Sequence, residues 1–287
     1  MRACIIVFSP GGHTLSVAQT IGASLEHEGI AYQLLNVTGL RELSDIDKLR
    51  SWLENTIEEH DVLFIGSPVY AGHLESNMLR LISCLPSQEQ AGGSAVPFVT
   101  YGGSHSSIAL IEAGESLHAM GRTCIGGLKI SSEHTLTQTL PVQKNAARPN
   151  DEDMQFVRDF VQRLIFKIRH GDFEDVSQAF YYVSDEEERL YRQKSQDDWH
   201  CGFRTVHADV SRCVGCGTCV PRCPVARISI ENGIARFDDT VTCILCSECF
   251  TACPQKAISF PYLDAVKARM VSGNMPAGDD VDNAAFL

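Results

Sequence analysis

The residues with the clearest chemistry are the cysteines, which occur twelve times and repeat one spacing twice. The first copy reads Cys213-x2-Cys216-x2-Cys219-x3-Cys223-Pro224, and the second, 30 residues later, reads Cys243-x2-Cys246-x2-Cys249-x3-Cys253-Pro254. Three thiolates on a tight loop can bind three irons of a cubane, and a more distant fourth cysteine completes the coordination. The spacing therefore predicts two [4Fe–4S] clusters, which accept and donate single electrons.

In paired motifs of this kind, the fourth cysteine of one copy binds the cluster of the other copy. One predicted ligand set is therefore Cys213, Cys216, Cys219 and Cys253. The other predicted set is Cys243, Cys246, Cys249 and Cys223. The repeat extends past the cysteines, because residues 226–229 (Ala-Arg-Ile-Ser) are echoed by residues 256–259 (Lys-Ala-Ile-Ser). Each echoed segment is expected to form a short strand beside a cluster.

This repeat resembles the bacterial two-cluster ferredoxins over about residues 205–260. The resemblance implies a small α+β domain that carries electrons. The alternative is a pair of zinc knuckles, since Cys-x2-Cys pairs also bind zinc. Four cysteines per copy, each ending in Cys-Pro, favour the clusters. Among the other cysteines, Cys4, Cys84 and Cys124 have apolar neighbours and are expected to be small buried residues, whereas Cys201 is assigned no role.

The elements that would position further chemistry occupy the first 140 residues, where short apolar runs alternate with amphipathic segments. The expected strands are residues 3–8, 32–37, 62–65, 97–101 and 124–130. The runs are nearly continuous in apolar residues, as in strands covered on both faces. The expected helices lie near residues 13–27, 43–59, 75–84, 106–119 and 151–169. Strand–helix units in series predict an α/β fold with a doubly wound, open, five-stranded parallel sheet.

Three glycine-containing loops follow expected strands, at the edge where open α/β sheets bind ligands. The first comprises residues 9–14 and opens into a helix, whose N-terminal N–H groups and dipole favour a phosphate. The others comprise residues 66–73 and 100–104, and each contains one tyrosine. Glycine lets the backbone approach a flat ring closely, and tyrosine can stack on it. The first loop matches neither the P-loop nor the dinucleotide G-x-G-x-x-G pattern.

These loops resemble those of flavodoxins, whose sheet has the order 2-1-3-4-5 and binds FMN at the switch point. The resemblance covers about residues 1–140 and implies that the FMN phosphate is held by Ser9, Gly11, Gly12 and Thr14, with His13 in the same turn. It implies that the isoalloxazine is bordered by Ser67, Pro68, Tyr70 and Gly72 on one side and by Tyr101, Gly102 and Gly103 on the other.

One position departs from the flavodoxin pattern, because flavodoxins usually carry threonine where this chain has Gly11. The change removes a hydroxyl donor, and a hydrogen bond to a charged group is worth about 1.5–3 kcal/mol. The loss is tolerable if the backbone N–H groups remain. The alternative to an FMN site is a flavodoxin-like scaffold with an empty or repurposed site.

Nearly the whole chain resembles fused flavodoxin–ferredoxin proteins found in anaerobes, which implies cytoplasmic electron transfer. The expected domains are a flavodoxin-like FMN domain at 1–170, a linker at 171–204, a ferredoxin-like domain with two [4Fe–4S] clusters at 205–260, and a helix and disordered tail at 261–287. Aromatic residues between 180 and 199 could pack on either domain, which the sequence leaves open.

Charge and composition limit the partners. The formal charge of −12 argues against a nucleic-acid binder, and the acidic excess lies in residues 1–200. This excess serves either solubility or steering towards a basic redox partner. The N-terminus lacks the flanks of a signal peptide, and no apolar run approaches the ~18 residues of a membrane span, so we expect a cytoplasmic protein without membrane contact.

Four histidines, His13, His73, His105 and His134, each follow an expected strand at the same sheet edge. Histidine can donate protons near neutral pH, which a reductase needs and a one-electron carrier does not. His73 and His105 are therefore candidate proton donors. The plainer interpretation is that these are polar loop residues that hydrogen-bond the backbone or the phosphate.

The leading hypothesis is an oxidoreductase that relays electrons between two [4Fe–4S] clusters and FMN, coupling one-electron to two-electron chemistry. One alternative is a dedicated electron carrier without its own substrate, and another is a redox-sensing interaction module. The partner would be a redox protein or a small-molecule electron acceptor. The sequence leaves open a homodimer, in which clusters could lie beside the flavin of another subunit.

Overall fold

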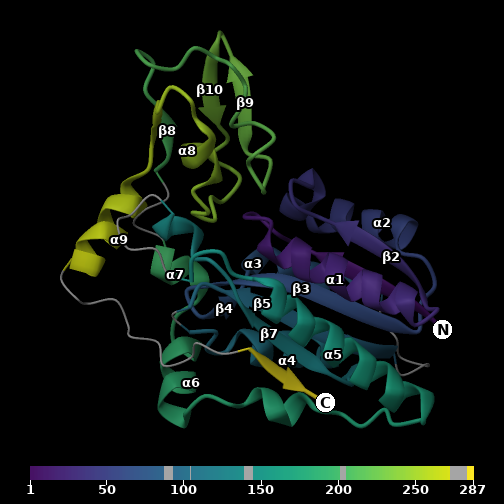
Figure 1. The fold of residues 1–287 in the computed structure, drawn as a ribbon. Coiled ribbons are helices and arrows are strands. Elements are labelled where there is room, and N and C mark those ends of the chain that lie inside the picture. Colours follow the sequence, from purple (N-terminus) through teal and green to yellow (C-terminus); the bar gives the residue numbers. More distant parts are fainter. Residues whose placement is uncertain (87–92, 104, 139–144, 201–204, 272–282) are drawn as a thin grey trace.

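The computed structural model describes residues 1–86, 93–103, 105–138, 145–200, 205–271 and 283–287, and its first half is built on one sheet (Figure 1). Five parallel strands lie in the order β2-β1-β3-β5-β7. Their bounds are β1 Arg2–Val7, β2 Ala31–Asn36, β3 Val62–Tyr70, β5 Gly93–Tyr101 and β7 Gly127–Ser131. This confirms the doubly wound parallel sheet that the sequence predicts.

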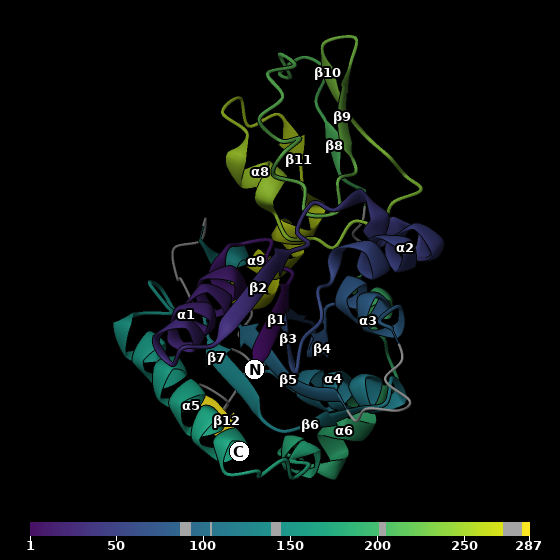
Figure 2. The same ribbon diagram turned by 90° about the vertical axis from the view of Figure 1, so that its right-hand side faces the viewer.

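The helices divide between the two faces of the sheet (Figure 2). One face is covered by α1 (His13–His27) and α5 (Asp151–Arg169), and the other by α2 (Ile46–Thr56), α3 (Ser76–Ser83) and α4 (Ala109–Ala119). Neighbouring residues of β1 enter opposite cores, because side chains alternate along a strand: Ile5 packs with α1 and Ile6 with α3. Within the described ranges, no helix combines the length and apolarity that a membrane span requires.

The sheet also contains short strands that the sequence analysis did not separate. The run expected over 124–130 is divided into β6 (Arg122–Cys124) and β7, which both pair with β5. A second short strand, β4 (His73–Leu74), turns back along β3. A third, β12 (Ala284–Phe286), pairs antiparallel with β7. The sheet edge beside β7 is therefore covered by a segment from the far end of the sequence.

The expectation of a disordered tail is wrong for residues 284–286, which form β12, whereas residues 272–282 lie outside the described residues. The physical reason is aromatic packing. Phe286 contacts the ring of Phe180 edge-on at 5.6 Å and stacks on Tyr182, also at 5.6 Å between ring centroids. These contacts and the pairing with β7 order the strand.

The segment between the domains packs against the first one. It forms a 3₁₀ turn, η3 (Ser177–Phe180), and the short helices α6 (Asp185–Arg192) and α7 (Gln196–His200). Phe180 is fully buried against Gly114 of α4 and Gly127 of β7. Arg192 forms an ion pair with Glu115 of α4 at 2.6 Å. The described aromatics between 180 and 191 thus lie on the first domain, while Cys201 lies outside the described residues.

The two cysteine motifs lie in a small module above the sheet (Figures 1 and 2). It contains two antiparallel pairs, β9 (Ile228–Glu231) with β10 (Ile234–Phe237) and β8 (His207–Ala208) with β11 (Ile258–Ser259). It also contains α8 (Glu248–Ala252) and is followed by α9 (Pro261–Val271). As expected, both echoed segments contribute a strand, β9 and β11. The module contacts the first domain directly, because Gly39 N–H donates to the carbonyl of Pro224 at 2.7 Å.

We predict that Phe180→Ala lowers the free energy of unfolding by about 3–5 kcal/mol, since it removes a fully buried ring. Urea denaturation followed by circular dichroism measures the change. Phe173→Ala is the matched control, because this phenylalanine of the same segment is 48% exposed and its loss should cost less than about 0.5 kcal/mol. Equal losses in the two variants would contradict the packing of the segment on the first domain.

Candidate functional site

The structure brings together the four cysteines assigned to the first cluster, which we call set A: Cys213, Cys216, Cys219 and Cys253. They line one small cavity that also touches Ile230, Ala235 and Ile258. The backbone N–H of Ala235 donates to Cys213 Sγ at 3.4 Å, and that of Ala257 donates to Cys253 Sγ at 3.3 Å. Hydrogen bonds to sulfur of this kind are found around iron–sulfur clusters, where they tune the potential. The donor set therefore fits a [4Fe–4S] cluster.

The other four cysteines form a second group, set B: Cys243, Cys246, Cys249 and Cys223. Burial raises the pKa of Cys249 to about 12, and the nearby charges of Cys243 and Cys223 act in the same direction. Burial also raises the pKa of Cys246. Thiols of this kind stay protonated unless a cation compensates their charge, so iron would keep them as thiolates. Cys219 of set A also raises the pKa of Cys249, which places the two sets next to each other.

The two copies of the motif have the same backbone conformation. Three pairs of residues that are 30 positions apart have positive φ: Gly215 with Leu245, Gly217 with Ser247, and Ala226 with Lys256. The left-handed region suits glycine but costs a side chain about 1–2 kcal/mol, so Leu245 marks a position where a large side chain is retained despite strain.

Among the described residues, no three His, Cys, Asp or Glu side chains converge on a point that could hold a single metal ion.

A cavity of about 120 Å³ lies between the sheet and the module. Its walls come from the loops that follow β1, β3, β5 and β7, at the carboxyl edge where ligands of such sheets bind. The module contributes two side chains, Leu245 from the loop of set B and Tyr262 from α9. A ligand in this cavity would therefore lie between the strand ends and set B.

The end of the cavity at α1 has donors for a phosphate. Gly12 has a φ of 85°, and no side chain caps the helix. In the described part of the chain, no acceptor is recorded for the backbone N–H groups of Gly11, His13 and Thr14. His13 Nε2 is buried without a hydrogen-bond partner, and burial lowers the pKa of His13, so the ring is neutral at pH 7. This donor set fits the phosphate of FMN.

Hydroxyl groups hold the same turn in place. Ser9 Oγ accepts a hydrogen bond from Leu15 N–H at 2.9 Å, and Ser9 N–H donates to Thr38 Oγ1 at 2.8 Å. Thr14 Oγ1 lies 2.8 Å from Thr100 Oγ1, so this pair keeps one O–H for a further acceptor. Thr38 was missed by sequence reasoning, because it follows β2 and belongs to none of the three loops, whereas Thr100 begins the loop 100–104 but was assigned no role.

Six residues that were predicted to contact FMN line this cavity: Gly11, His13, Thr14, Pro68, Tyr70 and Gly102. Ser9 and Gly12 lie in the same turn. Ser67 lies elsewhere, because its hydroxyl donates to the carbonyl of Pro68 at 2.9 Å and accepts from Glu75 N–H at 3.2 Å.

Three more predicted residues do not line the cavity. Tyr101 is buried, and the ammonium of Lys129 lies 5.4 Å from its ring. Gly72 lies against the ring of Tyr191, and Gly103 lies against Asn145.

The structure gives a physical reason for glycine at position 11. A Cβ on Gly11 would lie 2.7 Å from Thr135 Cγ2, and a Cβ on Gly102 would lie 2.7 Å from the ring of His134. The segment after β7 therefore crosses both glycines, and a threonine at position 11 would clash with it. Pockets for cofactors usually enclose about 300–1,000 Å³, so this cavity of about 120 Å³ is narrower than a site that holds a whole isoalloxazine ring.

The four histidines separate into two pairs. His13 and His134 line the cavity, whereas His73 and His105 both pack against the ring of Tyr191. His73 Nδ1 is 2.8 Å from a carboxylate oxygen of Glu112, and Tyr191 Oη is 2.9 Å from His105 Nε2. The separation arises because β4 turns back along β3 and carries His73 away from the strand end. His73 and His105 as proton donors therefore remain a proposal that the cavity lining does not favour.

A buried carboxyl group supports the loop after β3. Glu75 is fully buried at the N-terminus of α3, where it accepts hydrogen bonds from Asn77 N–H and Asn77 Nδ2, both at 2.9 Å. Burial raises the pKa of Glu75 to about 7, although these hydrogen bonds act in the opposite direction. The group therefore titrates near neutral pH, next to the end of β3 that contains Pro68 and Tyr70.

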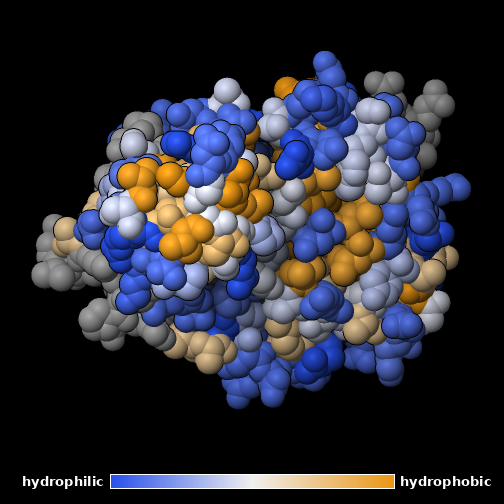
Figure 3. All heavy atoms as spheres, turned by 90° about the horizontal axis from the view of Figure 1, so that it is seen from above, coloured by the Kyte–Doolittle hydropathy of each residue, from blue (hydrophilic) through white to orange (hydrophobic). Residues whose placement is uncertain are grey.

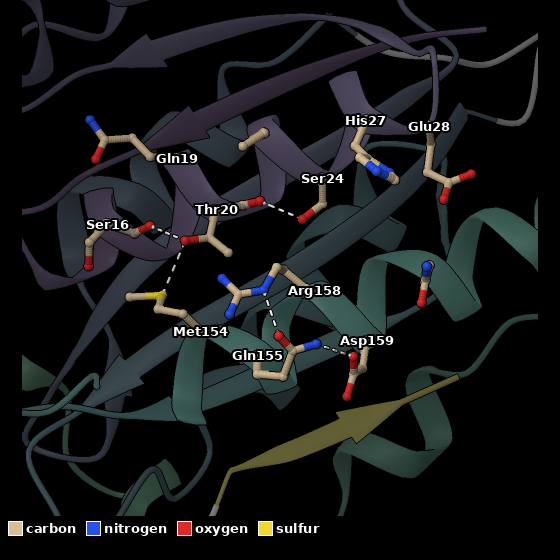
Figure 4. A pocket seen from close by; sticks show the side chains of 12 residues that line it. Ser16, Gln19, Thr20, Ser24, His27, Glu28, Met154, Gln155, Arg158 and Asp159 are labelled. Carbon is tan, nitrogen blue, oxygen red and sulfur yellow. Dashed lines mark hydrogen bonds between the residues drawn. The ribbon is translucent and has the colours of Figure 1, made fainter. Parts of the chain in front are cut away.

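A larger groove of about 580 Å³ lies away from these loops, between α1 and α5 (Figure 4). Its side chains bond to one another: Arg158 donates to Gln155 at 2.9 Å, and Gln155 donates to Asp159 at 2.7 Å. This groove contains none of the cysteines or strand-end loops, and we assign it no role.

We predict that Glu75 makes stability fall as pH rises. Its pKa is about 7 in the folded protein and about 4.3 in an unfolded chain, so the folded state binds the extra proton between these values. Glu75→Gln should remove this pH dependence of the free energy of unfolding, which amounts to at most about 3 kcal/mol between pH 4.5 and pH 7.5. Urea midpoints across this range measure it. Glu54→Gln, an exposed residue of α2, is the control and should follow the parent protein; the same slope in Glu75→Gln would contradict the assignment.

Two family models match the chain. Residues 1–136 match the model of NADPH-dependent FMN reductases, and residues 212–258 match the model of 4Fe-4S dicluster domains. These matches indicate FMN and two [4Fe–4S] clusters as cofactors, in agreement with the donors described above. No curated protein matches the chain.

Similar solved structures include a flavodoxin from the domain Archaea, with 21% identity, a TM-score of 0.40, and coverage of 59% of this chain and 100% of that one. Oxidised flavodoxin 1 from Bacillus cereus has 16% identity, a TM-score of 0.42, and coverage of 58% and 98%. Rubredoxin oxygen:oxidoreductase from the anaerobe Desulfovibrio gigas has 16% identity and a TM-score of 0.43, with coverage of 59% of this chain and 36% of that one. The two family matches and the sheet order together show a flavodoxin-like first domain that matches the model of FMN reductases, followed by a segment that matches the model of 4Fe-4S dicluster domains.

Proposed function

We propose that this chain is an electron-transfer oxidoreductase that exchanges electrons between FMN and two [4Fe–4S] clusters, with set B next to the flavin. The observation that carries the proposal is that Leu245, which lies between Cys243 and Cys246 in the sequence, lines the cavity at the strand ends. When bound, the clusters supply one-electron transfer and FMN links it to two-electron chemistry.

The residues around this cavity have separate roles in the proposal. The N–H groups of Gly11, His13 and Thr14 bind the phosphate, and set A and set B bind the irons. Tyr70 connects the two sites, because it lines the cavity while burial, and then the charge of Cys246, raises the pKa of its phenol. Leu245 fills the remaining space between set B and the strand ends.

Contacts within one chain support transfer without a second subunit. Leu245 belongs to the same apolar cluster as Leu136 of the first domain, and Ile244 belongs to the large core that includes Phe8 and Val37. The hydrogen bond from Gly39 to Pro224 fixes the same arrangement. The flavin of each chain would therefore lie beside set B of that chain.

A second candidate function is a dedicated electron carrier without a substrate of its own. Leu245 and Tyr262 form the module side of the cavity, so the module restricts the approach of a substrate to a bound flavin. This observation favours the carrier over a reductase of large substrates. The sensing alternative gains no such support, because Phe180 and Tyr191 of its suggested docking segment pack on the first domain.

We predict that Cys246→Ser, which removes a ligand of set B, slows reduction of the flavin at least tenfold while leaving the FMN content unchanged. The reason is that the proposed path to the flavin passes through set B. Stopped-flow absorbance at the flavin band, with a reduced one-electron protein carrier as donor, measures the rate. Cys4→Ser is the control, since Cys4 is buried in the first domain and is not a ligand. A rate equal to that of the parent protein would show that the flavin accepts electrons directly.

A further inference from the structure

The pseudo-twofold repeat allows the two cysteine loops to be compared position by position. Loop A comprises residues 213–219, and loop B comprises residues 243–249, with equivalent positions 30 apart. Val214 of loop A is 64% exposed, whereas its equivalent in loop B, Ile244, is 2% exposed. Cys216 is exposed, whereas its equivalent Cys246 is 8% exposed. The two loops have the same backbone conformation, but loop B is covered and loop A is open to solvent.

Loop B shows the effect of covering this face of the cysteine motif with another domain. The first domain lies against it, and the contact brings set B to the flavin cavity through Leu245. Loop A has glycine at the position equivalent to Leu245, and a Cβ on this Gly215 would lie 2.3 Å from the carbonyl oxygen of Gly233, so the turn between β9 and β10 packs against it. The open face of loop A is therefore the one that presents Val214 and the exposed Cys216, and a protein that contacts Val214 would lie beside a ligand of set A.

The open face differs from the covered face in charge as well. Arg212 and Lys256 flank set A, and both are exposed. Their equivalents beside set B are Thr242 and Ala226, which are uncharged. Among the described residues, neither Arg212 nor Lys256 forms an ion pair with a carboxylate. The open face therefore has two cations that the covered face lacks, in a chain whose formal charge is −12.

One acidic residue, Asp209, lies close enough to Arg212 for the two charges to interact. Asp209 accepts hydrogen bonds from Ser211 N–H at 2.9 Å and Ser211 Oγ at 2.7 Å, and the charge of Arg212 lowers its pKa further. Its equivalent in the second copy is also an aspartate, Asp239, so this acid does not distinguish the two faces. At physiological ionic strength, salt screens the part of the acidic excess of residues 1–200 that lies more than about 8 Å from this face.

Apolar side chains complete the open face. Val210 is 65% exposed, so it and Val214 are the most exposed of the large apolar side chains in the described chain, and both belong to the segment around loop A. Figure 3, which views the molecule from the module side, shows apolar side chains gathered in patches among hydrophilic ones. An apolar centre with a charged rim is the usual composition of a transient protein interface.

We propose that the open face around set A, formed by Val210, Val214, Arg212 and Lys256, is the docking site of a small acidic electron-carrier protein. The proposal rests on the proposed electron transfer and names its external partner. The cations select an acidic carrier over a basic one and accelerate its association, while the two valines provide the apolar contact. The exposed Cys216 then places set A at the point of contact.

The test is equilibrium binding of an oxidised acidic ferredoxin to the cluster-loaded chain by isothermal titration calorimetry at low salt. The double variant Arg212→Glu with Lys256→Glu should raise Kd at least tenfold, and the effect should shrink at high salt. Val214→Ser should raise Kd about threefold at either salt concentration, in line with a partial apolar loss. Iron analysis of each variant verifies that the clusters are retained.

The matched control is Arg158→Glu with Arg163→Glu, which reverses two exposed cations on α5 and should leave Kd within about twofold. Three results would overturn the docking site. The first is an unchanged Kd in the face variant, and the second is an equal rise of Kd in the control variant. The third is tighter binding of a basic cytochrome c than of the ferredoxin. Binding of an oxidised carrier requires no electron transfer. Loss of binding in the face variant alone would therefore support the site even if the flavin were not reduced.

Discussion

The rest of the structure depends on the burial of loop B against the carboxyl ends of the strands. Burying an aliphatic side chain such as Ile244 or Leu245 stabilises the contact by about 1.5–3 kcal/mol. Leucine in the left-handed region costs about 1–2 kcal/mol, so the contact of Leu245 offsets its own strain. The same contact closes the cavity between set B and the strand ends. The same contact therefore docks the two domains and places set B beside the cavity.

A repeated motif has been placed in two different environments. The two copies share their left-handed positions and their hydrogen bonds to sulfur, because the coordination of a cluster fixes both. They differ where coordination imposes nothing. Leu245 and Ile244 face the first domain, whereas Val214 faces solvent and Gly215 packs against Gly233. The pseudo-symmetric cysteine module thereby has one side against the first domain and one side open to solvent. An electron path through one chain needs such a difference between its two ends.

The sequence predicted the features that have a local chemical cause. The cysteine sets follow from a spacing that coordination demands, and α1 and α5 were predicted with their observed bounds. The structure adds a capping box at Asn150, which fixes the start of α5. The parallel sheet follows from its apolar runs. Features that depend on distant contacts were not predicted. The strand at 284–286 depends on Phe180, and the closure of the cavity depends on Thr135 meeting Gly11. The four histidines illustrate the same limit, since the turn at β4 separates His73 from the cavity.

The measurement that tests intrachain transfer most directly is the concentration dependence of flavin reduction after rapid mixing with excess dithionite. The clusters and the flavin have distinct absorbance, so the step from one to the other can be followed. Transfer from set B to the flavin of the same chain predicts a rate constant for this step that is unchanged across a hundredfold range of protein concentration. A rate constant that rises in proportion to protein concentration would contradict it, because electrons would then pass between chains.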